Sequence, residues 1–393
     1  MDDYPSNCAG RSLTFCRRSA KANHGTFAQM SRAIGVIGAS GRLGRIIVSQ
    51  ACARGWSVTA LSRRAHGGWP ETVVHAPLQD WSDTEAFGKA LKALDAVIVA
   101  AQTPDIALHR IALQHGCHLV DVVASADHVA AGLALDPLAK ASKVSLVLAA
   151  GLAPGLSGVL AKHMVTSFPD AARVDVLLLQ SAQGSAGFAG TCEMLDMLTD
   201  GRVGGWVHAK MSAAHPRGRP VHGAFAFPTV DSALGSLPPQ VAFYTRFDSN
   251  RLNMAIRLLS LIRRVSPGLY RRLRNRVARH KANTPSARLE TVELRTTASE
   301  AGGAVLGAVC RRFDSDYEAT AALSQIATEH VCRGALTSGA HMLHETMKQQ
   351  DFKTSRRPGK PLTACSHDKR TQNAFPKRQT PPTEVEGVIC SVA

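Results

Sequence analysis

Between residues 31 and 150, short apolar runs alternate with amphipathic helical patterns. The runs are almost wholly apolar, as in strands that helices cover on both faces, and they occupy residues 33–38, 57–61, 96–101, 118–123 and 144–149. Apolar residues at helical spacing fill the intervals, at 43–54, 83–93, 105–115 and 135–142. Strands that alternate with helices in this way pair in parallel. We therefore predict an α/β domain with a doubly wound parallel sheet over residues 31–150.

The pattern changes after residue 150. The later segments are helical patterns starting at 156, 191 and 317, an apolar run at 174–179, and two alternating runs at 287–297 and 304–311. Alternation of polar and apolar residues is typical of half-buried antiparallel strands. We therefore predict a second, α+β domain that contains an antiparallel sheet over residues 151–350.

The length of the chain and its charge distribution fit two globular domains with charged ends. The 393 residues exceed what one hydrophobic core usually serves. Residues 1–30, 251–288 and 351–393 carry nearly all of the formal net charge of +16. We predict a disordered arm at 1–30 and a disordered tail at 351–393, which contains five prolines. The rest is nearly neutral and aromatic residues are only 5%, so no specific nucleic-acid partner is expected.

Cysteine spacing and hydropathy bear on the compartment. The nine cysteines form no C-x-x-C motif and no zinc-type pairing with histidines, so we expect reduced thiols, a cytoplasmic protein and no metal site. The best candidate for a membrane span, residues 144–161, is interrupted by Gly, Pro and Ser. A buried strand, a loop and a helix start explain that run better.

A glycine-rich segment links the first predicted strand to the first predicted helix. It reads Gly35-Val-Ile-Gly38-Ala-Ser-Gly41-Arg-Leu-Gly44. In this context such glycines permit a tight turn, a close approach of backbone to a pyrophosphate and tight packing of helix on strand, while the helix N-terminus attracts phosphate. We therefore predict a dinucleotide-binding loop whose contact residues are Gly38, Ser40, Gly41, Arg42, Leu43 and Gly44.

The residues after the second strand bear on the choice of dinucleotide. An acidic residue there would bind the adenosine ribose, but this chain has Ser62, Arg63 and Arg64. Two guanidinium groups suit a 2′-phosphate, which favours NADP over NAD; the alternative is a pair of solvated loop arginines. Because strand ends lie over the cofactor in this topology, Ala100, Ala101 and Gln102 are predicted neighbours of the nicotinamide half.

Three further motifs give the chain a resemblance to the saccharopine dehydrogenase-like oxidoreductase family. They are D-x-V-I-x-A at 95–100, G-x-H-x-V-D at 116–121 and G-x-x-P-G-L-S at 151–157, and the likeness covers about residues 32–347. It implies a Rossmann domain, an α+β substrate and dimerisation domain, a homodimer, and hydride transfer to or from an imine, amino-acid-type or lipid-type substrate. The chain departs from the family in its very basic 251–288 stretch and lacks an evident cluster for two α-carboxylates near Gly151.

Asp121 is the best single candidate for a catalytic residue, because it ends a predicted parallel strand where ligands bind in such sheets. The alternative is a structural acceptor for backbone N–H groups. No Y-x-x-x-K pair, nucleophile elbow or H-E-x-x-H motif is present in the chain. A general acid is therefore not assigned from the sequence.

The stretch at 251–288 combines eleven cations with apolar residues at helical spacing, broken at Pro267. Three interpretations stay open: helices packed on the second domain, contact with an anionic membrane or a lipid-like substrate, and nonspecific RNA binding. For the whole chain, the alternatives to an oxidoreductase are a nonenzymatic NADP-binding redox sensor and a membrane-associated protein that acts through this stretch.

Overall fold

The computed structural model describes residues 32–80, 83–184, 186–200, 205–211, 221–227, 230–231, 239–283, 290–352 and 389–391. The described residues belong to one compact unit. The predicted arm at 1–30 lies outside them, and so does the predicted tail apart from residues 351–352 and 389–391.

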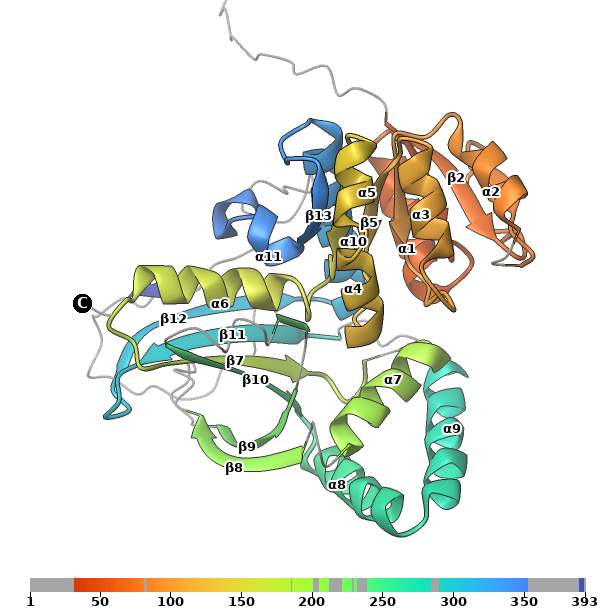
Figure 1. Cartoon of the computed structure of the whole chain (residues 1–393). Helices are drawn as coiled ribbons and strands as arrows, with labels where there is room; N and C mark the ends of the chain where they lie inside the picture. The colour runs from red at the N-terminus through yellow and green to blue at the C-terminus, as the bar shows by residue number, and fades with distance from the viewer. Residues whose placement is uncertain are drawn as a thin grey trace, which may run out of the picture. The chain divides into compact units, whose positions relative to one another are not determined.

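The first sheet has seven strands, all parallel, and has the Rossmann-type arrangement (Figure 1). The strand order is β13-β6-β5-β4-β1-β2-β3, with bounds Gly339–Met342, Ser145–Leu148, His118–Asp121, Ala96–Val99, Ala33–Ile37, Ser57–Ser62 and Val74–Pro77. All five strands predicted from the apolar runs are present, which confirms the doubly wound sheet. The two edge strands, β3 and β13, were not predicted, because both are short and only partly buried.

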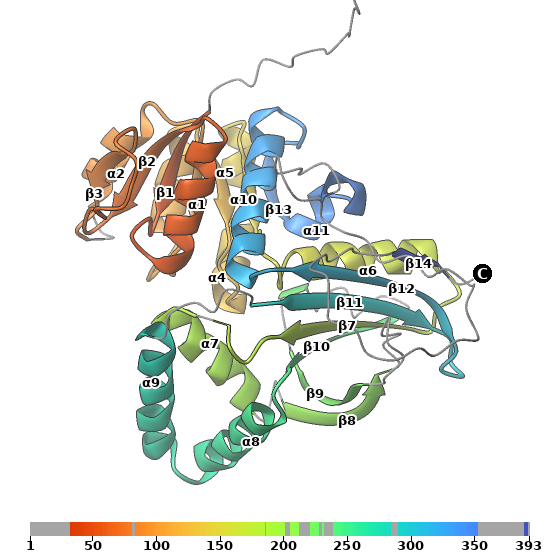
Figure 2. The same ribbon diagram turned by 180° about the vertical axis from the view of Figure 1, so that it is seen from behind.

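Helices cover both faces of the first sheet. They are α1 (Arg42–Ala53), α2 (Thr84–Leu91), α3 (Ala107–Gln114), α4 (Ala126–Leu133), α5 (Asp136–Ala141) and α10 (Asp316–Cys332). On one face, α1 and α10 lie side by side, and Ile47 and Ala321 share an apolar cluster with Val36 of β1 (Figure 2). On the other face, side chains of α2, α3 and α5 form a second cluster (Figure 1). The short apolar strands predicted from the sequence are therefore buried from both sides.

The Rossmann-type half takes two elements from far along the chain. The predicted second domain, residues 151–350, includes α10 and the unpredicted β13, whereas in the structure β13 joins the first sheet and α10 packs on it. A local pattern identifies a helix or strand but does not say which sheet a distant element joins. The predicted boundary at residue 150 therefore separates the two sheets only for residues before α10, because the chain returns to the first sheet from there on.

The second sheet also has seven strands. Their order is β14-β12-β11-β7-β10-β9-β8, with bounds Ile389–Ser391, Val305–Phe313, Val292–Ser299, Arg173–Gln180, Gln240–Phe247, Val221–Ala226 and Gly205–Met211. Neighbouring strands are antiparallel, as predicted, except that β7 and β10 are parallel. Strand β14 pairs with β12, which corrects the prediction that the tail is disordered throughout.

The remaining helices belong to this half of the chain or to its end: α6 (Leu156–Ser167), α7 (Phe188–Thr199), α8 (Asn250–Val265), α9 (Pro267–Asn283), α11 (Leu343–Thr346) and a 3-10 turn at Gln349–Phe352. The break between α8 and α9 comes at Pro267, as the sequence predicted. Among the described residues, no helix combines the length and apolar composition needed to cross a lipid bilayer.

One apolar core joins the two sheets. It contains Val120 of β5, Leu160 of α6, Val176 of β7, Leu294 of β11 and Ala327 of α10. Since α6 begins directly after the segment that leaves the first sheet, this core fixes both ends of that segment.

The segment itself, residues 151–157, is held by a buried carboxylate. Oδ2 of Asp231 accepts hydrogen bonds from the Gly155 backbone N–H at 2.9 Å and from Ser157 Oγ at 2.5 Å, and Oδ1 lies 3.1 Å from His344 Nδ1. Gly155 has φ 123°, and a Cβ there would lie 2.3 Å from the Gly151 carbonyl oxygen. The most specific motif of the sequence therefore forms a tight structural turn, clamped by Asp231.

Replacement of Asp231 is predicted to destabilise the protein. Asp231→Ala removes the acceptor of these buried groups, and we expect the free energy of unfolding to fall by roughly 2–4 kcal/mol. Urea unfolding followed by far-UV circular dichroism measures this change. Asp170→Ala, at an exposed carboxylate, is the control and should change stability by less than about 0.5 kcal/mol; equal effects of the two substitutions would contradict the clamp.

Candidate active site

Three predicted site segments meet at the carboxyl edge of the first sheet. Ile37 of β1 pairs with Val99 of β4, and Val99 pairs with Asp121 of β5. This row of residues ends three adjacent parallel strands. The phosphate loop, the segment 100–102 and the Asp121 side chain therefore lie next to one another, at the edge where such sheets bind ligands.

The glycine loop has the close approaches that exclude side chains. Gly38 has φ 79°, and a Cβ on it would lie 2.6 Å from the Ala101 Cβ. A Cβ on Gly44 would lie 2.2 Å from the Gly38 carbonyl oxygen and 2.8 Å from the Ala39 Cα. Gly41 is the N-cap of α1, and no side chain caps this helix. The helix N-terminus is therefore built as an anion site, and the loop fits a dinucleotide pyrophosphate.

The other predicted loop residues lie around this turn. Ser40 is exposed, while Leu43 packs against the apolar cluster beneath α1. Arg42 lies near the first turn of α10: burial raises the pKa of Asp316 to about 6, and the Arg42 charge acts in the opposite direction. The structure thus places Ser40 at the surface of the loop and Arg42 between the N-termini of two helices.

The segment after β2 leaves its two arginine side chains exposed. Ser62 is buried, and its Oγ donates a hydrogen bond to the Arg64 carbonyl oxygen at 2.8 Å. Gln79 Nε2 donates to the Arg63 carbonyl oxygen at 3.2 Å. The backbone is therefore held, while neither guanidinium group forms an ion pair with a residue that the structure describes. Both are available to a phosphate.

Asp121 lies at the centre of a buried polar cluster. Its Oδ2 is 2.6 Å from His109 Nε2 and 2.7 Å from His128 Nε2, and its Oδ1 accepts a hydrogen bond from the Val123 backbone N–H at 2.7 Å. Asp121 and His109 are fully buried, and His128 is 8% exposed. His109 comes from α3, which precedes β5 in the chain, and His128 comes from α4, which follows it.

The protonation states of this cluster follow from the hydrogen bonds. Burial opposes ionisation of Asp121, but the hydrogen bonds from His109 and His128 outweigh it and lower the Asp121 pKa. An ionised carboxylate only accepts hydrogen bonds, so both histidines present an Nε2–H to it. The hydrogen bond to Asp121 raises the pKa of His128, although burial opposes this. His128 therefore keeps a second proton, on Nδ1, to higher pH than an ordinary histidine.

Glu193 of α7 adds a carboxyl group next to His128. Each of the two residues affects the pKa of the other through its charge. Burial raises the pKa of Glu193, and its Oε1 is buried without a hydrogen-bond partner among the described residues. A helix that precedes strands of the second sheet thus brings a second carboxyl group close to His128, at the edge of the first sheet.

Two histidines and an aspartate are also residue types that bind metals, and their three nearest ligand atoms lie within 4.8 Å of one another. The two N···O distances are hydrogen-bond lengths. A metal-bound His109 would carry its remaining proton on Nδ1, which is buried and has no acceptor among the described residues, whereas metal-ligating histidines normally have one. We interpret the cluster as a hydrogen-bonded relay.

The sequence indicated Asp121 as a candidate but gave no indication that the structure brings three residues to it, His109, His128 and Glu193. The sequence held one indication that His109 is buried: it lies four residues before Leu113, on the apolar face of its helix. Nothing local indicated that α7 would lie beside α4, so Glu193 had no signal.

Comparison with known proteins supports the first half of the site. Residues 38–134 match a family model described as NAD(P)H-binding. The match includes the glycine loop, the arginines after β2, residues 100–102 and the Asp121 cluster. The chain therefore contains an NAD(P)H-binding domain.

Solved structures of similar arrangement are distant in sequence. The C. glutamicum DAP dehydrogenase in complex with DAP is 13% identical, with a TM-score of 0.48, and the match covers 81% of this chain and 94% of that one. An engineered D-amino acid dehydrogenase bound to NADP+ has the same identity and coverage and a TM-score of 0.47. At these scores the similarity carries no argument about substrate. A comparison with proteins of curated function finds no match.

The glycine loop gives the first test of the site. In Gly44→Ala the new Cβ meets backbone atoms of Gly38 and Ala39, so we expect the loop to shift and NADPH affinity to fall about tenfold or more. Calorimetric titration with NADPH measures the change. Gly302→Ala is the control, because its Cβ meets no atom within 4 Å; unchanged affinity in Gly44→Ala would show that the loop does not bind the dinucleotide.

Proposed function

We propose that the protein is an NADP-dependent oxidoreductase of the saccharopine dehydrogenase-like type. The observation that carries the proposal is the position of the buried Asp121–His128 pair: Asp121 ends β5, two strands from β1 and its dinucleotide loop, and His128 of α4 lies 2.7 Å from it. A redox sensor without catalysis needs the loop but not a proton donor next to it. The cluster therefore favours an enzyme over the sensor.

The first half of the chain holds and orients the cofactor. The α1 N-terminus and the glycine loop bind the pyrophosphate, Arg63 and Arg64 bind the 2′-phosphate, and residues 100–102 lie beside the nicotinamide. A bound nicotinamide supplies a carbon that gives or accepts hydride. The adenosine end thus selects the phosphorylated dinucleotide, while the other end lies against the Asp121 cluster.

His128 supplies the proton that accompanies hydride transfer. Reduction of a C=N or activated C=C bond adds hydride to one atom and a proton to its neighbour, so a donor must lie beside the nicotinamide. Asp121 fixes the His128 ring through Nε2 and stabilises its charged form, which leaves Nδ1–H as the donor. Glu193, next to His128, is the group from which the proton is restored.

The substrate is proposed to be an imine, an amino-acid-type or a lipid-type molecule. An amine product carries positive charge, and the carboxylate of Asp121, whose pKa is lowered, makes this edge of the sheet favourable to it. The family resemblance supports the same classes and also a homodimer. Imines, enals and enoyl thioesters are the compounds to screen for consumption of NADPH.

The choice of cofactor is tested by removing the two arginines. Arg63→Ala with Arg64→Ala should weaken NADPH binding about tenfold to a hundredfold, because the 2′-phosphate loses its charged partners, and change NADH binding about twofold or less. Calorimetric titration with each dinucleotide measures both effects. Equal weakening of the two would reject the 2′-phosphate assignment.

The proton donor is tested by the pH dependence of reduction. The His128 pKa is raised, so the protonated form, which supports reduction, is present below that pKa and is lost as pH rises through it. We expect the rate of NADPH oxidation with a substrate found in the screen to fall on the alkaline side, and His128→Asn to lower the rate about a hundredfold and abolish this pH limb.

His115→Asn is the matched control, since His115 is an exposed histidine at the end of α3. It should leave both rate and pH profile as they are. An unchanged alkaline limb in His128→Asn would assign the proton to another group.

A further inference from the structure

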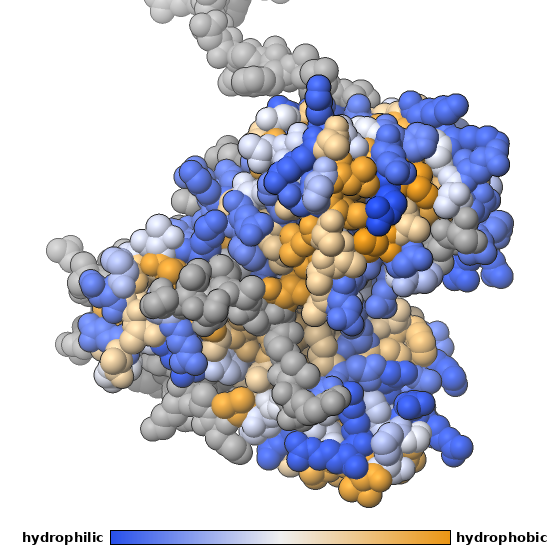
Figure 3. Space-filling view, in the orientation of Figure 1, coloured by the Kyte–Doolittle hydropathy of each residue, from blue (hydrophilic) through white to orange (hydrophobic). Residues whose placement is uncertain are grey.

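Exposed apolar side chains gather on one part of the molecule, the two helices α8 and α9, which we call the basic helical hairpin (residues 250–283). Six of the nine large apolar side chains that the described residues expose lie on it: Met254 (58%), Leu258 (58%), Leu261 (57%), Val265 (86%), Leu269 (47%) and Val277 (38%). The first four recur every three or four residues and form one stripe along α8. Figure 3 shows apolar residues exposed among strongly hydrophilic ones over this end of the molecule.

The charge of the hairpin has a single sign. Residues 250–283 contain ten arginines and lysines and no aspartate or glutamate. Six arginines are exposed, and none of them forms an ion pair with a described residue: Arg251, Arg264, Arg271, Arg272, Arg276 and Arg279. At 100° per residue, Arg251 and Arg264 flank the apolar stripe of α8 on its two sides.

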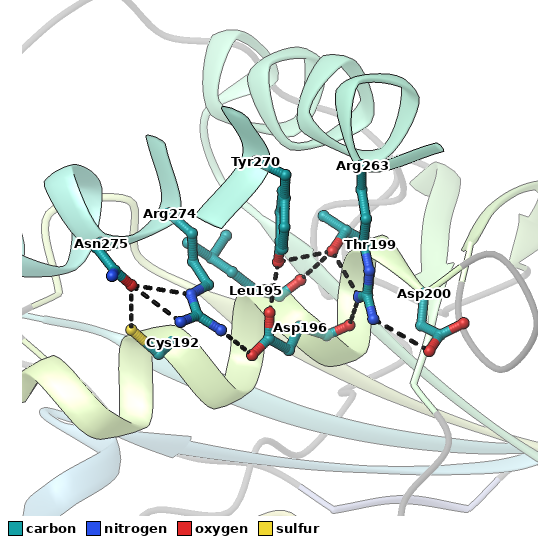
Figure 4. A network of polar contacts seen from close by, with 9 residues as sticks. All are labelled: Cys192, Leu195, Asp196, Thr199, Asp200, Arg263, Tyr270, Arg274 and Asn275. Atoms are coloured by element: carbon teal, nitrogen blue, oxygen red, sulfur yellow. Dashed lines mark hydrogen bonds and ion pairs between the residues drawn. The ribbon is translucent and has the colours of Figure 1, made fainter. Parts of the chain in front are cut away.

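Two other arginines of the hairpin, Arg263 and Arg274, form ion pairs that hold it to the rest of the protein. Arg263 pairs at 3.3 Å with Asp200, which directly follows α7, and Arg274 pairs with Asp196 of α7 (Figure 4). The Tyr270 hydroxyl donates a hydrogen bond to Asp196 Oδ1 at 2.7 Å, and burial raises the pKa of Tyr270 to about 12. The hairpin is thus anchored by charges directed at α7, and Lys281 also donates hydrogen bonds to the carbonyl oxygens of Ala182 and Gly184 at 2.6 Å. The six exposed arginines take no part in this anchoring.

We propose that the basic helical hairpin docks on a bilayer surface that contains anionic lipids. An apolar stripe flanked by arginines on a helix of low mean hydropathy is the pattern of a helix that lies in the plane of the interface. The aliphatic side chains would enter the boundary of the acyl chains, while the arginines contact phosphate and carboxylate headgroups. This surface is separate from the dinucleotide loop, and the proposal does not depend on the function proposed above.

The composition of the patch argues against other occupants. A twofold contact between two copies would place the same arginines against each other, with no acidic residue on the hairpin to compensate. Single-stranded nucleic acid is bound through cations together with aromatic stacking, whereas the exposed side chains between these arginines are aliphatic.

The test is flotation of the full chain with vesicles. We expect binding to phosphatidylcholine vesicles that contain about one third phosphatidylserine, at least about tenfold weaker binding to phosphatidylcholine alone, and release by salt. Leu258→Gln with Leu261→Gln should lower binding to the anionic vesicles about tenfold, and so should Arg264→Gln with Arg272→Gln. Val74→Gln and Arg110→Gln, at an exposed valine and an exposed arginine elsewhere, are the matched controls and should bind as the original chain does.

Thermal unfolding of each variant, which should match that of the original chain, separates lost docking from lost folding. The proposal is overturned if neither vesicle is bound, if both vesicles are bound equally, or if hairpin variants and controls behave alike. Sedimentation in the absence of vesicles tests the remaining alternative, a dimer formed through the apolar stripe. If the original chain is a dimer and the double variant Leu258→Gln with Leu261→Gln is a monomer, the stripe binds a second copy and the membrane proposal is overturned.

Discussion

A negative charge inside a protein requires partners, and the charge of Asp121 governs how the carboxyl edge of the first sheet is built. An ionised carboxylate without partners in a fully buried position is strongly unfavourable. Here His109 and His128 approach the same oxygen from two different helices, which fixes α3 and α4 against the end of β5. The hydrogen bond between His128 and Asp121 also raises the His128 pKa, so one contact both offsets the buried charge and favours the protonated form of the proposed proton donor.

Residues with a local reason for their identity were predictable from the sequence. Gly38 is needed because its φ is positive and a Cβ there would meet the Ala101 Cβ, and Gly44 is needed because backbone atoms come within 3 Å of where its Cβ would be. That need appears in any strand, turn and helix of this kind. Asp121 was found for a similar reason, since it ends a strand. The buried strands were predictable because their apolar runs have no polar face.

Contacts between distant segments were not predictable in this way. Strand β13 joins the first sheet beside β6 after about 190 intervening residues, and α10 packs on α1 after about 260. Glu193 and His128 come together only because α7 lies beside α4. The role of Asp231 was also not predictable, because no local pattern around it indicates that it accepts hydrogen bonds from the turn at 151–157. The most specific motif was therefore recognisable, but its role as a clamped turn was not.

The proposed site and the proposed docking surface share one helix. Helix α7 carries Glu193, which affects the pKa of His128. It also carries Asp196, and Asp200 directly follows it; these two carboxylates hold the basic helical hairpin through Arg274 and Arg263. Because these ion pairs are partly buried and the Tyr270 hydroxyl bonds to Asp196 as well, a displacement of the hairpin must either break them or move α7. Moving α7 alters the distance from Glu193 to His128. The hairpin therefore does more than expose a cationic surface, since its anchoring also sets the position of Glu193, which lies on the same face of α7 as Asp196.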